Sequence, residues 1–234
     1  APVTINRYIN VMKKLQKAIP DFYGKEDITF HELNSDFIAT FDLFLKTEAG
    51  LCRNTIVRYM KCFKRITNMA LAKEWMRKDP FYGYKMAQDE TDPVFLTYPE
   101  LKSIMEKEFT IPRLALVRDI FVFAAFTGLA FANVSTLTKD NLVQDNNGDW
   151  WIRKGRVKLE RRHRASSVCN IPLLPVPLAI LKKYEEHPIC RKKSLCLPVI
   201  CNQRMNSYLK EIADLCNIRK NLTTHTAKHS KIYI

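Results

Sequence analysis

The sequence predicts a mainly α-helical protein with a small antiparallel β-sheet, arranged as two domains. Apolar residues recur at the 3.6-residue helical period along most of the chain. An Asn147-Gly148 pair lies between two β-prone segments, which is a hairpin signal. Residues 88–97 form an acidic, proline-containing stretch without periodicity, and a chain of 234 residues is long enough to bury a core on either side of it.

The N-terminal part is predicted to hold three helices. The first covers residues 4–15, and the second follows Ser35 as its N-cap, with apolar residues from Phe37 to Leu45. The third begins at about Asn54 and ends at Asp79-Pro80, because proline disfavours a helical conformation in the residue before it.

The third helix carries an unbalanced positive face. Glu74 alone opposes eight cations before Asp79. A charged helix face is often only its solvated side, but this imbalance favours contact with a phosphate backbone. The cations are Arg53, Arg58, Lys61, Lys64, Arg65, Lys73, Arg77 and Lys78, and the first five are predicted to bind DNA.

A domain boundary is predicted after this helix. Thr97 and Glu100 form a capping-box pattern with Pro99 in the first turn, so a new helix is expected to begin at about residue 98. We therefore assign residues 1–87 to a helical DNA-binding domain, 88–97 to a linker and 98–234 to a second domain.

The second domain is predicted to mix helices with the sheet. An apolar helix over 118–126 breaks at Thr127-Gly128-Leu129, and a short helix and a strand follow it. The second strand begins at Trp150, and a third covers 168–173. Further helices are expected from Pro175, over residues 202–218 and at the C-terminus, where Thr224 is the expected N-cap.

The segment between the second and third strands is strongly basic. Seven cations fall within twelve residues, with Glu160 as the only acid among them. Such a hairpin tip is predicted to contact DNA or RNA. The cations are Arg153, Lys154, Arg156, Lys158, Arg161, Arg162 and Arg164.

The overall charge agrees with an anionic partner. The chain has 38 Lys and Arg against 24 Asp and Glu, a net charge of +14, which indicates nucleic acid unless the charge serves only solubility. Seven cysteines show no CxxC pair or metal-ligand spacing, so reduced thiols and no metal are expected. No apolar run approaches the ~18 residues of a membrane span. A cytoplasmic, nucleoid-associated bacterial protein is the expectation.

The order of these features resembles the tyrosine recombinase (phage integrase) family, particularly the integrases of Bacteroides-type mobile elements. Four motifs carry the resemblance in order: NTIVRYMKCFKRI, FTGLAFANVSTLT, the hairpin lysine of RKGRVK, and THTAKH, which is similar to the family's His-x-x-Arg box. The resemblance implies a helical core-binding domain and a catalytic domain that close around duplex DNA as a C-shaped clamp. It also implies self-association into a tetramer on DNA.

The resemblance further implies site-specific strand cleavage and rejoining through a 3′-phosphotyrosyl intermediate, without a metal or nucleotide cofactor. Lys158 matches the general acid, with a simple phosphate contact as the alternative. His225 matches the residue that contacts the scissile phosphate or assists proton transfer, with an ordinary surface or core histidine as the alternative. Lys228 stands at the second Arg position, and Tyr233 is the candidate nucleophile.

Three departures from the family pattern weaken the catalytic interpretation. Ala130 follows Thr-Gly-Leu where most members have Arg, although the resemblance implies that related Bacteroides-type enzymes also lack this Arg. Lys228 lacks the planar fork of arginine, which is the more serious loss. Tyr233 follows Lys228 by five residues rather than about thirty, so we interpret the catalytic domain as incomplete at its C-terminus. The alternatives are a catalytically degenerate integrase that only binds DNA, and an RNA-binding basic protein.

Overall fold

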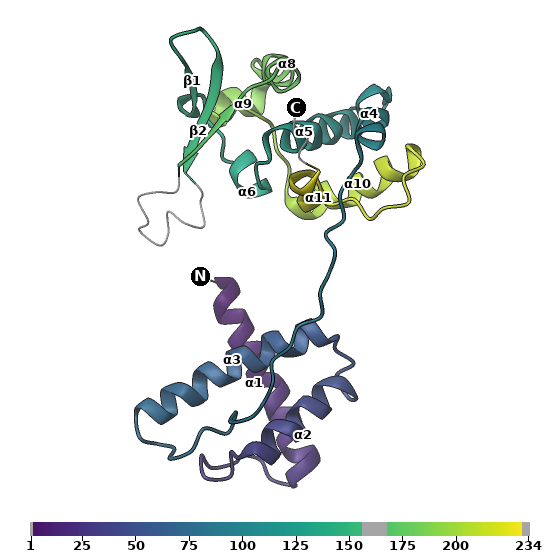
Figure 1. The fold of residues 1–234 in the computed structure, drawn as a ribbon. Coiled ribbons are helices and arrows are strands. Elements are labelled where there is room, and N and C mark those ends of the chain that lie inside the picture. Colours follow the sequence, from purple (N-terminus) through teal and green to yellow (C-terminus); the bar gives the residue numbers. More distant parts are fainter. Residues whose placement is uncertain (1, 156–167, 231–234) are drawn as a thin grey trace. The chain divides into compact units, whose positions relative to one another are not determined.

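The computed structural model describes residues 2–155 and 168–230, and it divides into two compact units, Ala1–Thr91 and Asp92–Ile234. The division falls inside the stretch that the sequence analysis assigns to a linker. Elements of both units are labelled in Figure 1. None of the described helices is long and apolar enough to cross a membrane.

The first unit consists of helices α1 (Pro2–Tyr23), α2 (Ser35–Lys46) and α3 (Arg53–Ala72), which pack on one another. Its core combines aliphatic residues with phenylalanines, and Phe41 and Phe63 are in edge-to-face contact at 5.7 Å between ring centroids. The N-cap of α2 is Asn34, whose side chain accepts a hydrogen bond from Phe37 N, so the prediction of Ser35 as the cap is wrong by one residue.

Helix α3 ends at Ala72, before the predicted stop at Asp79-Pro80. Glu74 adopts a left-handed conformation with φ 59°. The amide of Trp75 then donates to Ala70 O at 2.9 Å and that of Glu74 to Leu71 O at 3.0 Å. These are the two hydrogen bonds of a Schellman motif, which ends a helix without a proline. Arg77 and Lys78 therefore lie beyond the helix.

The second unit is organised around α5 (Pro112–Thr127), whose residues are buried on nearly every side. Against α5 pack α4 (Tyr98–Glu106), α8 (Pro175–Tyr184), α10 (Asn202–Leu215) and α11 (Thr224–His229). The predicted capping box of Thr97 and Glu100 is present at the start of α4. Two shorter helices, α6 (Phe131–Val134) and α9 (Pro188–Lys193), complete the helical part with the 3-10 turn η1 (Lys139–Asn141).

The sheet of this unit has three antiparallel strands in the order β1 (Leu142–Gln144), β2 (Trp150–Gly155) and β3 (Val168–Pro172), as the sequence predicts. In the predicted hairpin, Gly148 has φ 87°, a conformation that glycine adopts without strain. The carboxylate of Asp145 accepts hydrogen bonds from the amides of Asn147 and Asp149 and from the indole of Trp151. Ile152 of β2 is fully buried and joins the sheet to the core.

Candidate nucleic-acid interface

Helix α11 presents the THTAKH motif as a helix with two different faces. Thr226 and Ala227 are buried, and Ala227 belongs to the same core cluster as Ile120 and Ala124 of α5. His225, Lys228 and His229 are exposed. The two residues that the sequence analysis selects here, His225 and Lys228, therefore share the accessible side of a helix whose other side is fixed in the core.

Hydrogen bonds at both ends hold α11 in place. Its N-cap is Thr223, which accepts from Thr226 N, so the predicted N-cap Thr224 is wrong by one residue. Thr224 instead binds α10, where its amide donates to Asn206 Oδ1 at 2.9 Å and its hydroxyl to Asn202 Oδ1 at 2.7 Å. At the other end, the buried Ser230 hydroxyl accepts from Leu96 N at 2.7 Å and donates to Thr226 O at 2.8 Å.

The Thr-Gly-Leu motif forms the C-terminal cap of α5. Gly128 has φ 65°, and the Thr127 hydroxyl donates back to Phe123 O at 2.7 Å. Ala130 follows as the N-cap residue of α6 and is half-buried. Its methyl group provides no hydrogen-bond donor, so this turn lacks the guanidinium that most members of the resembled family carry.

Two of the seven hairpin cations lie among the described residues. Arg153 is exposed on β2, whereas Lys154 donates to Thr136 O at 2.6 Å and to Asn141 Oδ1 at 2.9 Å, which ties β2 to the segment after α6. The other predicted residues lie outside the described ranges, so their DNA-binding and catalytic roles stay predictions. These are Arg156, Lys158, Arg161, Arg162 and Arg164, together with Tyr233.

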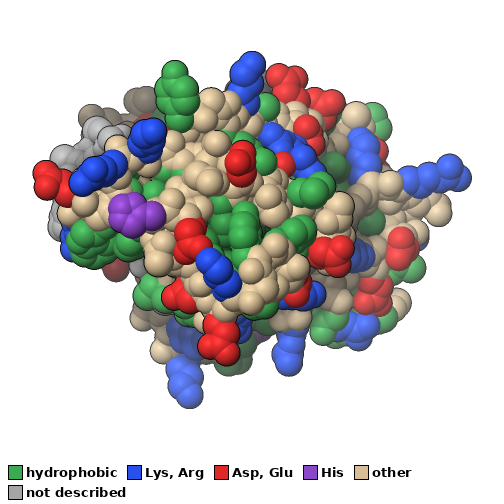
Figure 2. Space-filling model, turned by 90° about the horizontal axis from the view of Figure 1, so that it is seen from below, with side chains coloured by type: hydrophobic (Ala, Val, Ile, Leu, Met, Phe, Trp, Pro, Cys, Tyr) green, Lys and Arg blue, Asp and Glu red, His purple; other side chains and the backbone are tan. Residues whose placement is uncertain are grey.

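The fold separates the cations of α3 into two groups. Arg58, Lys61 and Arg65 are exposed, and their spacing places them along one side of the helix. Lys64 instead lies 3.8 Å from the Asp79 carboxylate and 5.7 Å from the centre of the Phe81 ring. Figure 2 shows one face of the molecule on which Lys and Arg are mixed with Asp and Glu. The predicted phosphate contacts of α3 therefore depend on which individual cations are accessible, not on net charge alone.

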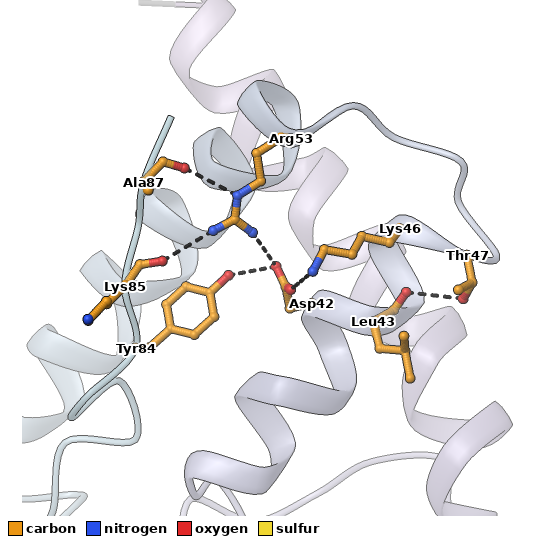
Figure 3. Close-up of polar contacts among 8 residues, drawn as sticks. All are labelled: Asp42, Leu43, Lys46, Thr47, Arg53, Tyr84, Lys85 and Ala87. Atoms are coloured by element: carbon orange, nitrogen blue, oxygen red, sulfur yellow. Dashed lines mark hydrogen bonds and ion pairs between the residues drawn. The ribbon is translucent and has the colours of Figure 1, made fainter. Parts of the chain in front are cut away.

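Arg53 occupies a network inside the first unit (Figure 3). Its guanidinium donates to Lys85 O and Ala87 O, each at 3.2 Å, and reaches the buried carboxylate of Asp42 at 3.4 Å. The same carboxylate accepts from Tyr84 Oη at 2.6 Å and pairs with Lys46 at 2.7 Å. Arg53 thus holds residues 84–87 against α2 and α3, and its predicted contact with DNA stays a prediction.

The pKa values of this network follow from its contacts. Burial acts to raise the pKa of Asp42, but the hydrogen bonds from Lys46 and Tyr84 and the charges of Lys46 and Arg53 outweigh burial and hold it below the usual range. Burial, reinforced by the hydrogen bond to Asp42, raises the pKa of Tyr84 to about 12. Asp42 is therefore the ionised centre of the network at neutral pH, and Tyr84 is its neutral donor.

Sequence reasoning missed two features of these sites. His229 lies next to His225 on α11, and the four-residue spacing of the two histidines is the signal that could have indicated it. The role of Asp42 had no such signal. Its partners Arg53 and Tyr84 are 11 and 42 residues away, and only the folded chain brings them together.

The comparisons with known proteins agree with this architecture. Residues 1–86 match the model of the phage integrase SAM-like domain. No curated protein sequence matches the chain. Among solved structures, a lambda integrase dimer bound to a COC′ core site has a TM-score of 0.74 at 12% identity, covering 98% of this chain and 78% of that one.

Two further solved structures are similar over nearly the whole chain. The XerH site-specific recombinase bound to palindromic difH gives a TM-score of 0.70 at 16% identity, covering 97% of this chain and 67% of that one. The Tn1549 transposon integrase in complex with a circular intermediate DNA gives a TM-score of 0.65 at 16% identity, covering 96% of this chain and 79% of that one.

The fold therefore matches that of the core-binding and catalytic domains of tyrosine recombinases, as the sequence predicts. More particularly, residues 1–86 of the N-terminal unit match a phage integrase SAM-like domain. The identities of 12–16% establish likeness of fold, and the chemistry has to be argued from the residues of this chain.

Proposed function

We propose that this chain is a tyrosine recombinase of a mobile element, which binds duplex DNA and cleaves and rejoins its strands through a 3′-phosphotyrosyl intermediate. The observation that carries the proposal is the accessible face of α11. His225 and Lys228 stand on the exposed side of a helix whose other side is buried against α5, within a recombinase fold. Side chains held in this way reach a phosphate with little loss of conformational freedom.

The chemistry of the exposed groups suits phosphoryl transfer. Attack by a tyrosine on a phosphodiester concentrates negative charge on the non-bridging oxygens, and preorganised cations and N–H donors stabilise that charge. His225 contributes an imidazole and Lys228 an ammonium. In this proposal Lys158 protonates the leaving 5′-oxygen, and Tyr233 is the candidate nucleophile within the sequence. Duplex DNA is the substrate, and the active assembly is a tetramer on DNA.

The test is covalent attachment to a nicked duplex, from which the released strand diffuses away and traps the intermediate. Strand transfer by this chain predicts a protein–DNA complex that survives denaturation and that disappears in the His225→Ala variant. The Tyr233→Phe variant identifies the nucleophile if the complex also disappears there. If the protein binds the duplex but no covalent complex forms, strand transfer is excluded.

That outcome would leave a second function, DNA binding without cleavage. The lysine at 228 and the alanine at 130 favour it, because neither provides the bidentate fork that arginine offers to a phosphate. A degenerate integrase of this kind would occupy recombination sites and regulate them. A binding competition between duplex DNA and structured RNA distinguishes strand transfer on DNA and DNA binding without cleavage from RNA binding.

A further inference from the structure

The first unit contains a pocket of about 710 Å³ between the segment that leads into α2 and the segment that follows α3. Much of its wall is apolar and is formed by Phe30, Leu33, Met76, Pro80 and Tyr82. Tyr82 is 89% exposed, and Phe30 is exposed as well. Aromatic side chains that lie open around a hollow are typical of a surface that another molecule covers.

The rim of this pocket is positively charged. Arg77 and Lys78 line it, and both are exposed. Asp79, the carboxylate of the same wall, already accepts from Phe81 N at 2.9 Å and lies 3.8 Å from Lys64. Within the described ranges neither Arg77 nor Lys78 takes part in an ion pair. The occupant that suits the pocket therefore combines apolar side chains with negative charge.

The chain itself contains a segment with this chemistry, residues 90–95, which lies outside helices and strands. Glu90 and Asp92 supply two exposed carboxylates, and neither forms an ion pair with any residue that the structure describes. Val94 and Phe95 are exposed apolar side chains, and the Lys220 ammonium lies 5.7 Å from the centre of the Phe95 ring. The segment thus offers two acids followed by two apolar groups, the complement of two cations beside an apolar hollow.

The segment is too short to fill the pocket of its own copy. It begins next to Asp89, whose amide and carbonyl bind the side chain of Asn54 at 2.9 and 3.0 Å, at the start of α3. The helix rises about 1.5 Å per residue, so its last residue, Ala72, lies about 27 Å from Asn54, and the Met76 wall of the pocket follows that end. Fully extended chain carries Phe95 at most about 21 Å from Asp89. The occupant therefore comes from a second copy.

We propose that residues 90–95 of one copy occupy the pocket of a second copy, with the two apolar side chains in the hollow and the two carboxylates against Arg77 and Lys78. The inference rests on the proposed function, in which copies assemble on DNA, and it names a surface on which two of them meet. Because pocket and segment are different surfaces, the contact is head-to-tail, and each copy offers its segment to one neighbour and its pocket to another. A contact of this size is weak alone and strengthens when other contacts hold the copies together.

Photo-cross-linking of the full chain without DNA tests the contact independently of strand transfer. The photoreactive residue p-benzoylphenylalanine replaces Phe95 and keeps an aromatic ring there, and copies labelled with heavy and light isotopes are mixed before irradiation. We expect cross-links between a heavy and a light copy that map to residues 30–35 or 76–82, with a yield that rises with protein concentration. Absence of such cross-links, or cross-links within one copy only, would overturn the proposal.

Charge reversal tests whether the cross-links report this contact. Arg77→Glu with Lys78→Glu should lower their yield about 10-fold, because two attractions become two repulsions. Glu90→Lys with Asp92→Lys should lower the yield by a similar factor. A mixture of the two variants should restore the yield, since the reversed pocket of one copy then meets the reversed segment of the other. Restoration also shows that both variants fold, and a mixture that stays low contradicts the proposal.

The matched control is Lys13→Glu with Lys17→Glu. Both lysines are exposed on α1 and outside the pocket, so this variant carries the same change of charge and should leave the yield unchanged. An equal loss in this control refutes the contact. Unchanged cross-links in the Arg77 and Lys78 variant, together with weaker binding to duplex DNA, assign these two cations to DNA instead. If the parent chain forms no covalent complex with nicked DNA, strand transfer fails while the cross-links still decide this contact.

Discussion

Truncation of Asp42 should destabilise the first unit strongly. The Asp42→Ala variant removes an acceptor that is 8% exposed and serves Tyr84, Arg53 and Lys46. Hydrogen bonds to a charged group contribute roughly 1.5–3 kcal/mol each, whereas the pair with the half-exposed Lys46 contributes little. Breaking a buried ion pair from one side costs about 3–5 kcal/mol. Because the Arg53 side chain is 27% exposed, we expect the lower end, about 3 kcal/mol.

Native-state hydrogen exchange measures this loss within each unit of the intact chain. The opening free energy of amides in α2 and α3 should fall by about 3 kcal/mol, while amides in α5 serve as the internal reference. Asp36→Ala is the matched control, because Asp36 is exposed in the first turn of the same helix and should cost less than about 1 kcal/mol. A loss below about 1 kcal/mol for Asp42→Ala, or an equal loss in α5, would refute the reasoning.

The pH dependence of the stability difference between wild type and Asp42→Ala provides an independent check. The pKa of Asp42 is lowered by folding, so its stabilising contribution is fully present above the ordinary aspartate value and is lost as pH falls through the folded value. The difference between wild type and Asp42→Ala should therefore shrink below about pH 4. The raised pKa of Tyr84 has the opposite effect, and its contribution is lost as pH rises from about 10 towards about 12.

Three further outcomes are expected. Duplex binding should weaken steeply with salt. Replacing Arg58, Lys61 and Arg65 together by Gln should make the slope of log affinity against log salt concentration shallower by about 2.7, at ~0.9 per phosphate. An unchanged slope would show that these three residues do not contact DNA. Lys158→Ala should lower cleavage by roughly 10²–10⁴-fold with little loss of binding, and equal modest losses in both would indicate a simple phosphate contact. Ser230→Ala should destabilise the second unit by about 1–3 kcal/mol, because Leu96 N loses its buried acceptor. Denaturant unfolding followed by Trp150 and Trp151 fluorescence measures this loss of stability.

The elements that the sequence predicts well are those specified by residues close together in the chain. The Thr97–Glu100 capping box and the Asn147-Gly148 hairpin are local patterns, and the structure contains both. The end of α3 was predicted wrongly for a physical reason. A glutamate rarely adopts a left-handed conformation, so nothing in its identity marks Glu74 as the residue that ends the helix.

In the candidate site too, features set by neighbouring residues could be predicted and features set by long-range contacts could not. The exposed face of α11 follows from the helical spacing of His225, Lys228 and His229, and it could be predicted from the motif alone. The anchors of this helix could not be predicted in the same way. Ser230 binds Leu96, 134 residues earlier, and Thr224 binds Asn202 and Asn206 on a separate helix. Contacts of this kind depend on how elements pack, which periodicity does not specify.

Long-range contacts also change what the positive charge can do. Five cations of α3 are predicted to contact DNA from the sequence, and five phosphates at ~0.9 each imply a salt slope near −4.5 from this helix. In the folded chain Arg53 contacts Asp42 and two backbone carbonyl groups, and Lys64 lies 3.8 Å from the Asp79 carboxylate. Arg58, Lys61 and Arg65 remain exposed, and the contact of Lys61 is with the neutral Gln88 side chain at 2.9 Å, so the expected share of α3 falls to about −2.7. A total slope steeper than about −4 must then draw on other cations, and the sequence predicts that the seven between Arg153 and Arg164 supply them.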